Sequence, residues 1–96
     1  MKVYICGKRA NKAQFYKAEE ELINAGYSPI NPLKVIEALP KEINNSDFTL
    51  ISFEMIRVCE AIYLLDGWEK DLFARMEYSH AKREEKEIIR RGDVKS

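Results

Sequence analysis

The sequence predicts an α/β fold, a small flavodoxin-like or Rossmann-like three-layer sandwich with a parallel sheet of about four strands. Three observations support this prediction. Short apolar runs alternate with longer segments whose apolar residues recur at helical spacing. The resulting order β-α-β-α-β-α-β indicates parallel strands joined by helical crossovers, and the right-handedness of such crossovers leaves few topologies open. At 96 residues, one domain is expected.

The first half of the chain predicts two strands around one helix. Lys2–Cys6 is a short apolar strand. Asn11 followed by Gln14 resembles an amide version of a capping box, which predicts a helix start. Gly26 suits the left-handed end of that helix, and Tyr27–Ile30 forms the next strand. The inner face of the helix is expected to carry its regularly spaced apolar residues: Phe15, Ala18, Leu22 and Ala25.

The middle of the chain predicts one or two helical turns over residues 33–39 and then a polar loop after Pro40. A full helix follows, capped by Ser46 or Asn45. Its apolar stripe is expected to consist of Phe48, Ile51, Met55 and Val58.

The last part of the chain predicts a central strand, a helix and an edge strand. Ala61–Leu65 is the most apolar run, which is typical of a strand buried on both faces. The helix is expected from about Lys70 to Arg83, and Glu87–Arg90 is the last strand. The predicted inner face of this helix consists of Leu72, Phe73 and Met76. We assign residues 1–91 to one domain and residues 92–96 to a polar tail.

The composition limits the class of partner. Sixteen basic and sixteen acidic residues cancel, which argues against a nucleic-acid-binding protein. No apolar run approaches the roughly 20 residues that span a bilayer, and no signal peptide precedes the first strand, so we expect a cytoplasmic protein without a membrane partner. His80 has no cysteine or histidine cluster around it, so we expect no metal and no other cofactor. A domain this small gains stability from association, which makes a homodimer or higher oligomer plausible.

The turn after the first strand combines a glycine, cations and a helix N-terminus. Gly7, Lys8 and Arg9 stand there, ahead of the first helix. Backbone N–H groups and the helix dipole favour an anion at such a place. The turn is therefore a candidate phosphate or carboxylate site, although an ordinary exposed basic turn has the same composition.

A second set of candidates surrounds the end of the third strand. Ligands of open parallel sheets bind outside the carboxyl ends of the strands. Asp66, Gly67 and Trp68 follow the third strand directly, and the tryptophan ring can stack on a planar base or simply pack against the sheet end. Asp71 and Glu77 follow on the next helix. They are either solvated helix charges or a site pair.

Buried carboxylates need partners, because unpaired burial is expensive. If Glu77 turns inward, the hydroxyl of Tyr4 on the neighbouring strand is a candidate partner.

The sequence resembles the nucleoside 2-deoxyribosyltransferase-like superfamily over about residues 1–89, and within it a small branch found in bacteriophages and prophages. The resemblance is carried by Met-Lys-Val-Tyr-Ile-Cys-Gly at the start, Ala25-Gly26-Tyr27, Ile30-Asn31-Pro32, and Cys-Glu-Ala-Ile-Tyr-Leu-Leu-Asp-Gly-Trp-Glu ending at Glu69, with Glu77 downstream. It implies a flavodoxin-like sandwich that acts at the anomeric carbon of a nucleoside or nucleotide.

The resemblance also implies roles for single residues. Glu77 would be the nucleophile, Asp71 the acid that holds or protonates the ligand, and Tyr4 the hydroxyl that orients the glutamate. The carboxylate would attack C1′ to form a glycosyl-enzyme, which water or a second base resolves. The activity implied is N-glycosyl transfer or N-glycoside hydrolysis on a small nucleoside or nucleotide.

Two residues depart from the superfamily pattern. Ser52 occupies a ligand-binding position where an aspartate often contacts the departing base, and Phe73 replaces a glycine before the helix. These departures favour an alternative: a non-catalytic nucleotide-binding or protein-interaction module with a degenerate site, in a phage–host setting. Whether the chain is an enzyme stays open between the two.

Overall fold

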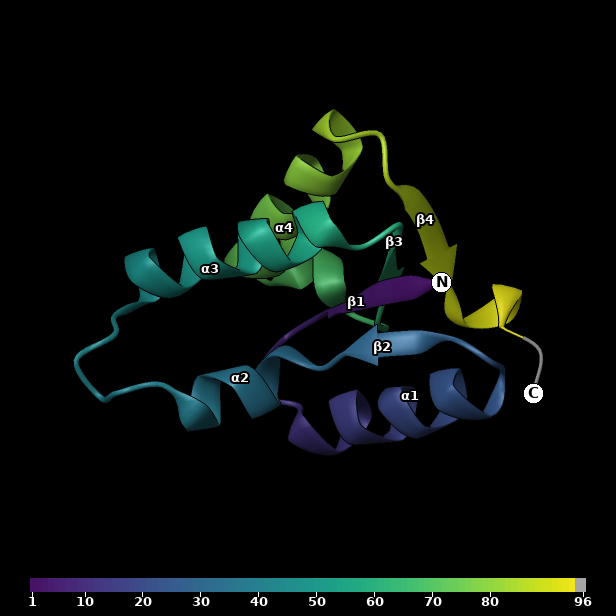
Figure 1. The fold of residues 1–96 in the computed structure, drawn as a ribbon, viewed down its shortest axis with the longest axis horizontal. Helices are drawn as coiled ribbons and strands as arrows, with labels where there is room; N and C mark the ends of the chain where they lie inside the picture. The colour runs from purple at the N-terminus through teal and green to yellow at the C-terminus, as the bar shows by residue number, and fades with distance from the viewer. Residues whose placement is uncertain (95–96) are drawn as a thin grey trace.

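A computed structural model describes residues 1–94. The elements follow one another as β1 (Lys2–Cys6), α1 (Lys12–Asn24), β2 (Ser28–Ile30), α2 (Pro32–Ala38), α3 (Asn45–Val58), β3 (Ala61–Leu64), the 3₁₀ turn η1 (Trp68–Lys70), α4 (Leu72–Arg83), β4 (Glu87–Arg90) and the 3₁₀ turn η2 (Arg91–Asp93). All four strands are parallel, in the order β2-β1-β3-β4. Figure 1 shows α1 and α2 below this sheet and α3 and α4 above it. The predicted three-layer α/β fold is confirmed.

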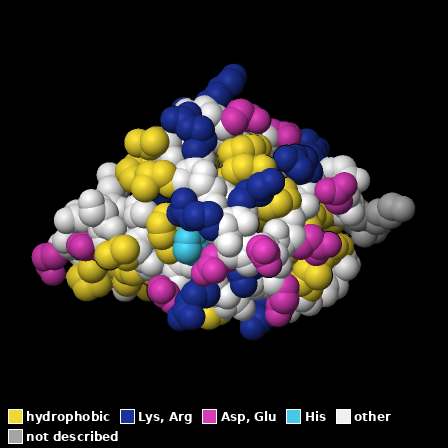
Figure 2. Space-filling view, turned by 90° about the horizontal axis from the view of Figure 1, so that it is seen from above, with side chains coloured by type: hydrophobic (Ala, Val, Ile, Leu, Met, Phe, Trp, Pro, Cys, Tyr) yellow, Lys and Arg dark blue, Asp and Glu magenta, His cyan; other side chains and the backbone are white. Residues whose placement is uncertain are grey.

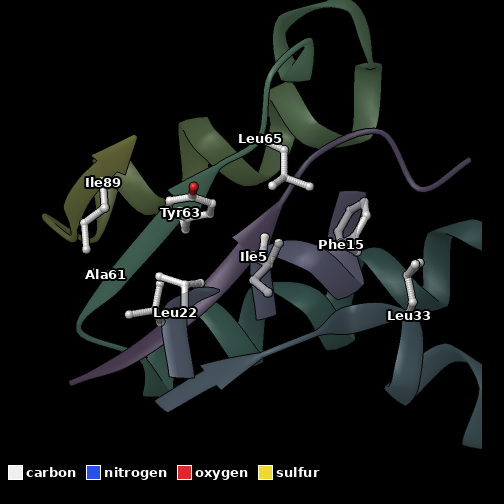
Figure 3. Packing of buried hydrophobic residues seen from close by; sticks show 10 residues of the cluster. Ile5, Phe15, Leu22, Leu33, Ala61, Tyr63, Leu65 and Ile89 are labelled. Atoms are coloured by element: carbon white, nitrogen blue, oxygen red, sulfur yellow. The ribbon is translucent and has the colours of Figure 1, made fainter. Parts of the chain in front are cut away.

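The alternation of side chains along the strands separates two cores. Val3 and Ile5 of β1 face α1, whereas Tyr4 and Cys6 face α3 and α4. Figure 3 shows the first core, in which Ile5 lies near Phe15 and other residues of α1. The central strands β1 and β3 are buried on both faces, as their apolar sequences predict.

Helix α1 matches its predicted packing but not its predicted cap. Phe15, Ala18 and Leu22 are buried, and Gly26 ends the helical segment at φ +92°. The side chain of Asn11 makes no capping hydrogen bond, so the predicted amide capping box is wrong. The backbone carbonyl of Asn11 instead accepts the first helical hydrogen bonds.

Helix α3 begins one or two residues earlier than predicted. Asn44, not Asn45 or Ser46, is the cap: its side chain accepts the backbone N–H of Asp47, and the Asp47 carboxylate accepts the backbone N–H of Asn44. The predicted apolar stripe is also wrong in part, because Val58 is 53% exposed. The inner positions recur four residues apart and are Phe48, Ser52 and Ile56.

Helix α4 turns a different face inward than predicted. Leu72 is 57% exposed and Met76 is 37% exposed, so the predicted inner face is wrong at these two positions. Figure 2 shows hydrophobic side chains among charged ones on this side of the molecule. The buried positions are Ala74, Glu77 and Ala81. Because the alanine side chains are small, α4 can lie close to β1 and β3. Glu77 is on the same face of the helix, so its carboxylate is buried.

The strand order fixes where a crevice forms. The chain passes from β1 through α1 to β2 on one face, and it returns through α3 to β3 on the other face. β1 and β3 are therefore neighbours whose following turns leave on opposite faces, which is the switch point where open α/β sheets bind ligands. The last described residue, Val94, packs against the α1 core, while residues 95 and 96 of the predicted tail lie outside the described part of the chain. Within residues 1–94, the helices are too short or too polar to cross a membrane.

Candidate active site

The centre of the site is a hydrogen bond between two buried side chains. The hydroxyl of Tyr4 donates to Oε2 of Glu77 at 2.6 Å. Tyr4 is fully buried and Glu77 is 3% exposed. Tyr4 points from β1 toward α4 because it alternates with Val3 and Ile5, which point toward α1. The structure thus joins two residues that the sequence proposed as partners.

A third side chain completes this cluster. Nη2 of Arg9 lies 3.2 Å from the same Oε2 of Glu77, and the Arg9 side chain is 20% exposed. Its Cζ lies 4.4 Å from the ring centre of Phe48 and 5.4 Å from that of Phe73. The partly buried ring of Phe73 therefore packs against Arg9, and the Arg9 side chain points toward Glu77 rather than away from the protein.

The electrostatics of the cluster follow from its burial. Removal from water raises the pKa of Glu77 above its ordinary value, while the hydrogen bond from Tyr4, the charge of Arg9 and the neighbouring Cys6 act to lower it. Burial and the nearby Glu77 carboxylate raise the pKa of Tyr4 well above its ordinary value. Tyr4 is therefore a proton donor in this hydrogen bond, and Glu77 is the acceptor.

Asp71 begins α4. Its Oδ2 accepts the backbone N–H of Ala74 at 2.9 Å, so the carboxylate is the N-cap of the helix that carries Glu77. The thiol of Cys6 donates to the carbonyl of Ala74 at 3.4 Å. Burial raises the pKa of Cys6, and the negative charges of Glu77 and Asp71 add to this rise.

The other candidates of the first turn take different positions. Gly7 is buried, and a Cβ added to it would lie 2.8 Å from Cβ and Cδ1 of Leu65. Lys8 is exposed. The hydroxyl of Ser52 donates to the carbonyl of Thr49 at 2.9 Å, so in this structure it bonds its own helix.

A hollow of about 370 Å³ opens beside this cluster. It is lined by Arg9 and Phe48 and by eight residues between positions 36 and 45, from the end of α2 to the start of α3. In Figure 1 this loop arches away from the sheet between α2 and α3. Arg9 lines the hollow and also contacts the carboxylate of Glu77, whereas Glu77 itself does not line the hollow.

The candidates after β3 line another hollow. Asp66, Gly67 and Trp68 border a space of about 230 Å³ that Arg90 and Arg91 close from the side of β4. The Trp68 ring packs on Tyr78 of α4, with ring centres 4.5 Å apart. Gly67 has φ +86°, which an L side chain rarely adopts, so the glycine is needed for the turn. The residues that line this hollow are not among those that line the hollow beside Arg9.

One site residue was missed by the sequence reasoning. Phe48 was predicted only as part of the apolar stripe of α3, and it is buried as expected. Its contact with Arg9 joins two segments that are far apart in the sequence, and no local sequence pattern predicts such a contact. Within residues 1–94, no group of three His, Cys, Asp or Glu side chains is arranged to hold a metal ion.

A solved structure supports the fold, and a family model matches nearly the whole chain. No curated protein sequence matches the chain. The solved structure of CMP N-glycosidase BcmB from Clostridium botulinum superimposes with a TM-score of 0.69 at 18% sequence identity, over 94% of this chain and 67% of that one. At this identity, the likeness shows a shared fold. Residues 1–90 match the family described as "Domain of unknown function (DUF4406)", and the chain belongs to that family.

Proposed function

We propose that the chain is an enzyme that cleaves or exchanges the N-glycosidic bond of a small nucleoside or nucleotide, with Glu77 as its nucleophile. The observation that carries the proposal is the hydrogen bond of 2.6 Å from Tyr4 to the buried carboxylate of Glu77. The pair lies beside the switch point of the sheet, where a ligand is expected. Burying a carboxylate is costly for folding, and acids with perturbed pKa values cluster at functional sites.

The geometry is consistent with a retaining reaction in two steps. Tyr4 and Arg9 both bind Oε2 of Glu77, which leaves Oε1 to attack C1′. As the C1′–N bond breaks, its electron pair leaves with the base, which takes a proton from Asp71 or from water. Water, or the nitrogen of a second base, then attacks C1′, gives up a proton and releases Glu77 as the carboxylate.

Other residues have supporting roles in this proposal. Lys8 and the N–H groups that follow Gly7 would bind a phosphate on the ligand. Trp68, Gly67 and Asp66 border the second hollow at the same end of the sheet. The shared fold with a protein named a CMP N-glycosidase supports a nucleotide as the substrate class. The resemblance to the deoxyribosyltransferase-like superfamily supports the glutamate as the nucleophile.

The test is chromatographic. Purified protein is incubated with a panel of ribonucleosides, deoxyribonucleosides and their 5′-monophosphates, with and without a second free base. We expect release or exchange of base by the wild type and none by Glu77→Gln. The matched control is Glu20→Gln, which changes an exposed carboxylate on α1 and should keep full activity. Activity retained by Glu77→Gln would contradict the proposed nucleophile.

A second candidate function is a binding module that does not turn its ligand over. It is favoured by the position of Arg9, which covers a carboxylate that is only 3% exposed. The hydroxyl of Ser52 is also occupied within its helix. In this case the partner is a nucleotide that is sequestered, or a protein, in the phage–host setting that the sequence resemblance suggests.

Thermal melting separates the two candidates. A binding module is stabilised by a nucleotide of the panel while no base is released. A protein-interaction module is stabilised by none of them.

A further inference from the structure

Arg9 makes two kinds of contact that an exposed cation in a turn would not make. Its guanidinium binds Oε2 of Glu77 at 3.2 Å, and it lies over the rings of Phe48 and Phe73. An arginine that served only a phosphate in solvent would project away from the protein. Here α3 and α4 each contribute an aromatic ring that holds it against the carboxylate.

The two rings restrict where the guanidinium can lie. A cation over an aromatic face is attracted by the ring quadrupole, and the attraction is stronger where water is partly excluded. The Arg9 side chain is only 20% exposed. Phe73 is the residue that departs from the glycine of the superfamily pattern, and the structure gives its ring a partner.

A cation beside a buried carboxylate favours its charged form. A buried acid tends to take up a proton, because burial disfavours the charged form. A protonated Glu77 cannot attack C1′. The groups that act on Glu77 come from β1 and the turn after it, and they are Tyr4, Cys6 and Arg9. Of these three, only Arg9 carries a positive charge.

The charged groups of the other packed elements lie elsewhere. On α3, Asp47 is bound in the cap with Asn44, and Glu54 pairs with Arg57 at the surface. On α4, the Asp71 carboxylate caps the helix at the backbone N–H of Ala74, and as a negative group it cannot favour a second carboxylate. No second cation therefore replaces Arg9 at Glu77 among the contacts of the described residues.

We propose that Arg9, held by Phe48 and Phe73, is the positioning residue that keeps the Glu77 carboxylate ionised and fixed in orientation. In that case a phosphate on the ligand would be bound by Lys8 and the backbone N–H groups at the start of α1, and not by Arg9. The consequence for the reaction rate rests on the proposed function, but the protonation state of Glu77 is measurable without any substrate.

The experiment is a titration by carbon NMR. Protein labelled with ¹³C at the glutamate side-chain carboxyl is titrated, and the Glu77 signal is assigned by its loss in Glu77→Gln. Arg9→Met keeps the length and apolar contacts of the side chain but removes the charge, while Arg9→Lys keeps the charge. We expect the pKa of Glu77 to rise by about 1–3 units in Arg9→Met, the range for loss of a nearby opposite charge, and by much less in Arg9→Lys.

A further variant tests the aromatic contacts. Phe73→Leu keeps an apolar side chain but removes the ring, so the pKa of Glu77 should rise by less than in Arg9→Met. An unchanged pKa in a folded Arg9→Met overturns the proposal. If Arg9→Met does not fold, an unchanged pKa in both Arg9→Lys and Phe73→Leu overturns it, and a rise in Phe73→Leu alone supports it.

Activity separates this proposal from the proposed function. If the wild type releases base, the acid limb of its pH–rate profile should move to higher pH in Arg9→Met, and Arg9→Lys should restore it. An unmoved profile rejects the role of Arg9 and leaves the enzyme intact. If the wild type releases no base while the pKa of Glu77 rises in Arg9→Met, the role of Arg9 stands and the proposed function fails.

Discussion

The two faces of the sheet are built from alternate residues of the same strands, yet they bury different kinds of side chain. The face toward α1 is a continuous apolar core in which Val3, Ile5, Phe15 and Leu22 pack together. The face toward α3 and α4 encloses the hydroxyl of Tyr4 and carboxylate of Glu77 among its apolar residues. The strand sequences alone would permit two similar cores.

The comparison indicates that one face of the sheet mainly contributes stability, whereas the other holds the polar groups of the candidate site. The α1 face has few polar side chains to satisfy, so its packing contributes stability through apolar burial. The other face holds groups whose burial is unfavourable unless each is paired. The two faces should therefore respond differently to substitution and to pH, and the following variants test this.

The largest effect is expected on the apolar face. Leu22 is fully buried, so Leu22→Ala should lower the free energy of unfolding by about 2–5 kcal/mol through lost contacts and a residual cavity. Urea denaturation measures the loss. The same truncation at Leu50, which is 67% exposed on α3, is the control and should change stability by no more than about 0.5 kcal/mol. Equal losses at the two positions would contradict the assignment of the core.

An intermediate effect is expected at the polar pair. Tyr4→Phe removes the donor to Glu77 and should lower the free energy of unfolding by about 1–3 kcal/mol. The effect depends on pH. The raised pKa of Glu77 means that its contribution to stability is complete below its ordinary value of 4.5 and is lost as the pH rises through the higher folded value.

Loss of the Tyr4 hydroxyl raises that folded value further, so Tyr4→Phe should destabilise the protein more at pH 8 than at pH 4. Denaturation at the two pH values measures the difference. Tyr16→Phe is the control, because the Tyr16 hydroxyl lies 3.4 Å from Glu37 at the surface. A loss for Tyr4→Phe that is independent of pH would argue against an ionised Glu77.

The smallest effect is expected at the start of α4. Asp71→Ala removes the N-cap and should lower the free energy of unfolding by about 1 kcal/mol. Asp71→Asn keeps a capping oxygen but removes the acid, so its stability should stay close to that of the wild type. Any base release should fall in both variants if Asp71 protonates the base. Full activity in Asp71→Asn would leave Asp71 only its structural role as the cap.

The strands and the first helix could be predicted from the sequence because local patterns specify them. Apolar runs mark β1 and β3, and Gly26 marks the end of the α1 segment. Tyr4 could be proposed as the partner of Glu77, because neighbouring parallel strands and the following helix bring these positions together. These predictions depend only on residues near one another in the chain or on the rules of βαβ topology.

The orientation of α4 could not be predicted from hydrophobicity. Leu72 and Met76 are more apolar than Ala74, yet Ala74 is buried and both larger side chains are exposed. A helix that lies close to a sheet needs small residues at the contact, and this requirement is set by the sheet rather than by the helix. The contacts of Arg9 were missed for a similar reason, since they form only when three distant elements come together.

The close approach of Gly7 to Leu65 has a consequence for redesign of the protein. With 2.8 Å between a hypothetical Cβ at position 7 and the Leu65 side chain, the ends of β1 and β3 leave no room for a larger residue at position 7. Libraries of variants that aim to change ligand preference should therefore keep Gly7 unchanged. They should vary the loop of residues 39–44, which has no regular helix or strand and borders the hollow beside Arg9. Under the proposed function, the strand ends at Gly7 would fix the position of the reacting bond, and the loop would determine which substituents of the substrate are accepted.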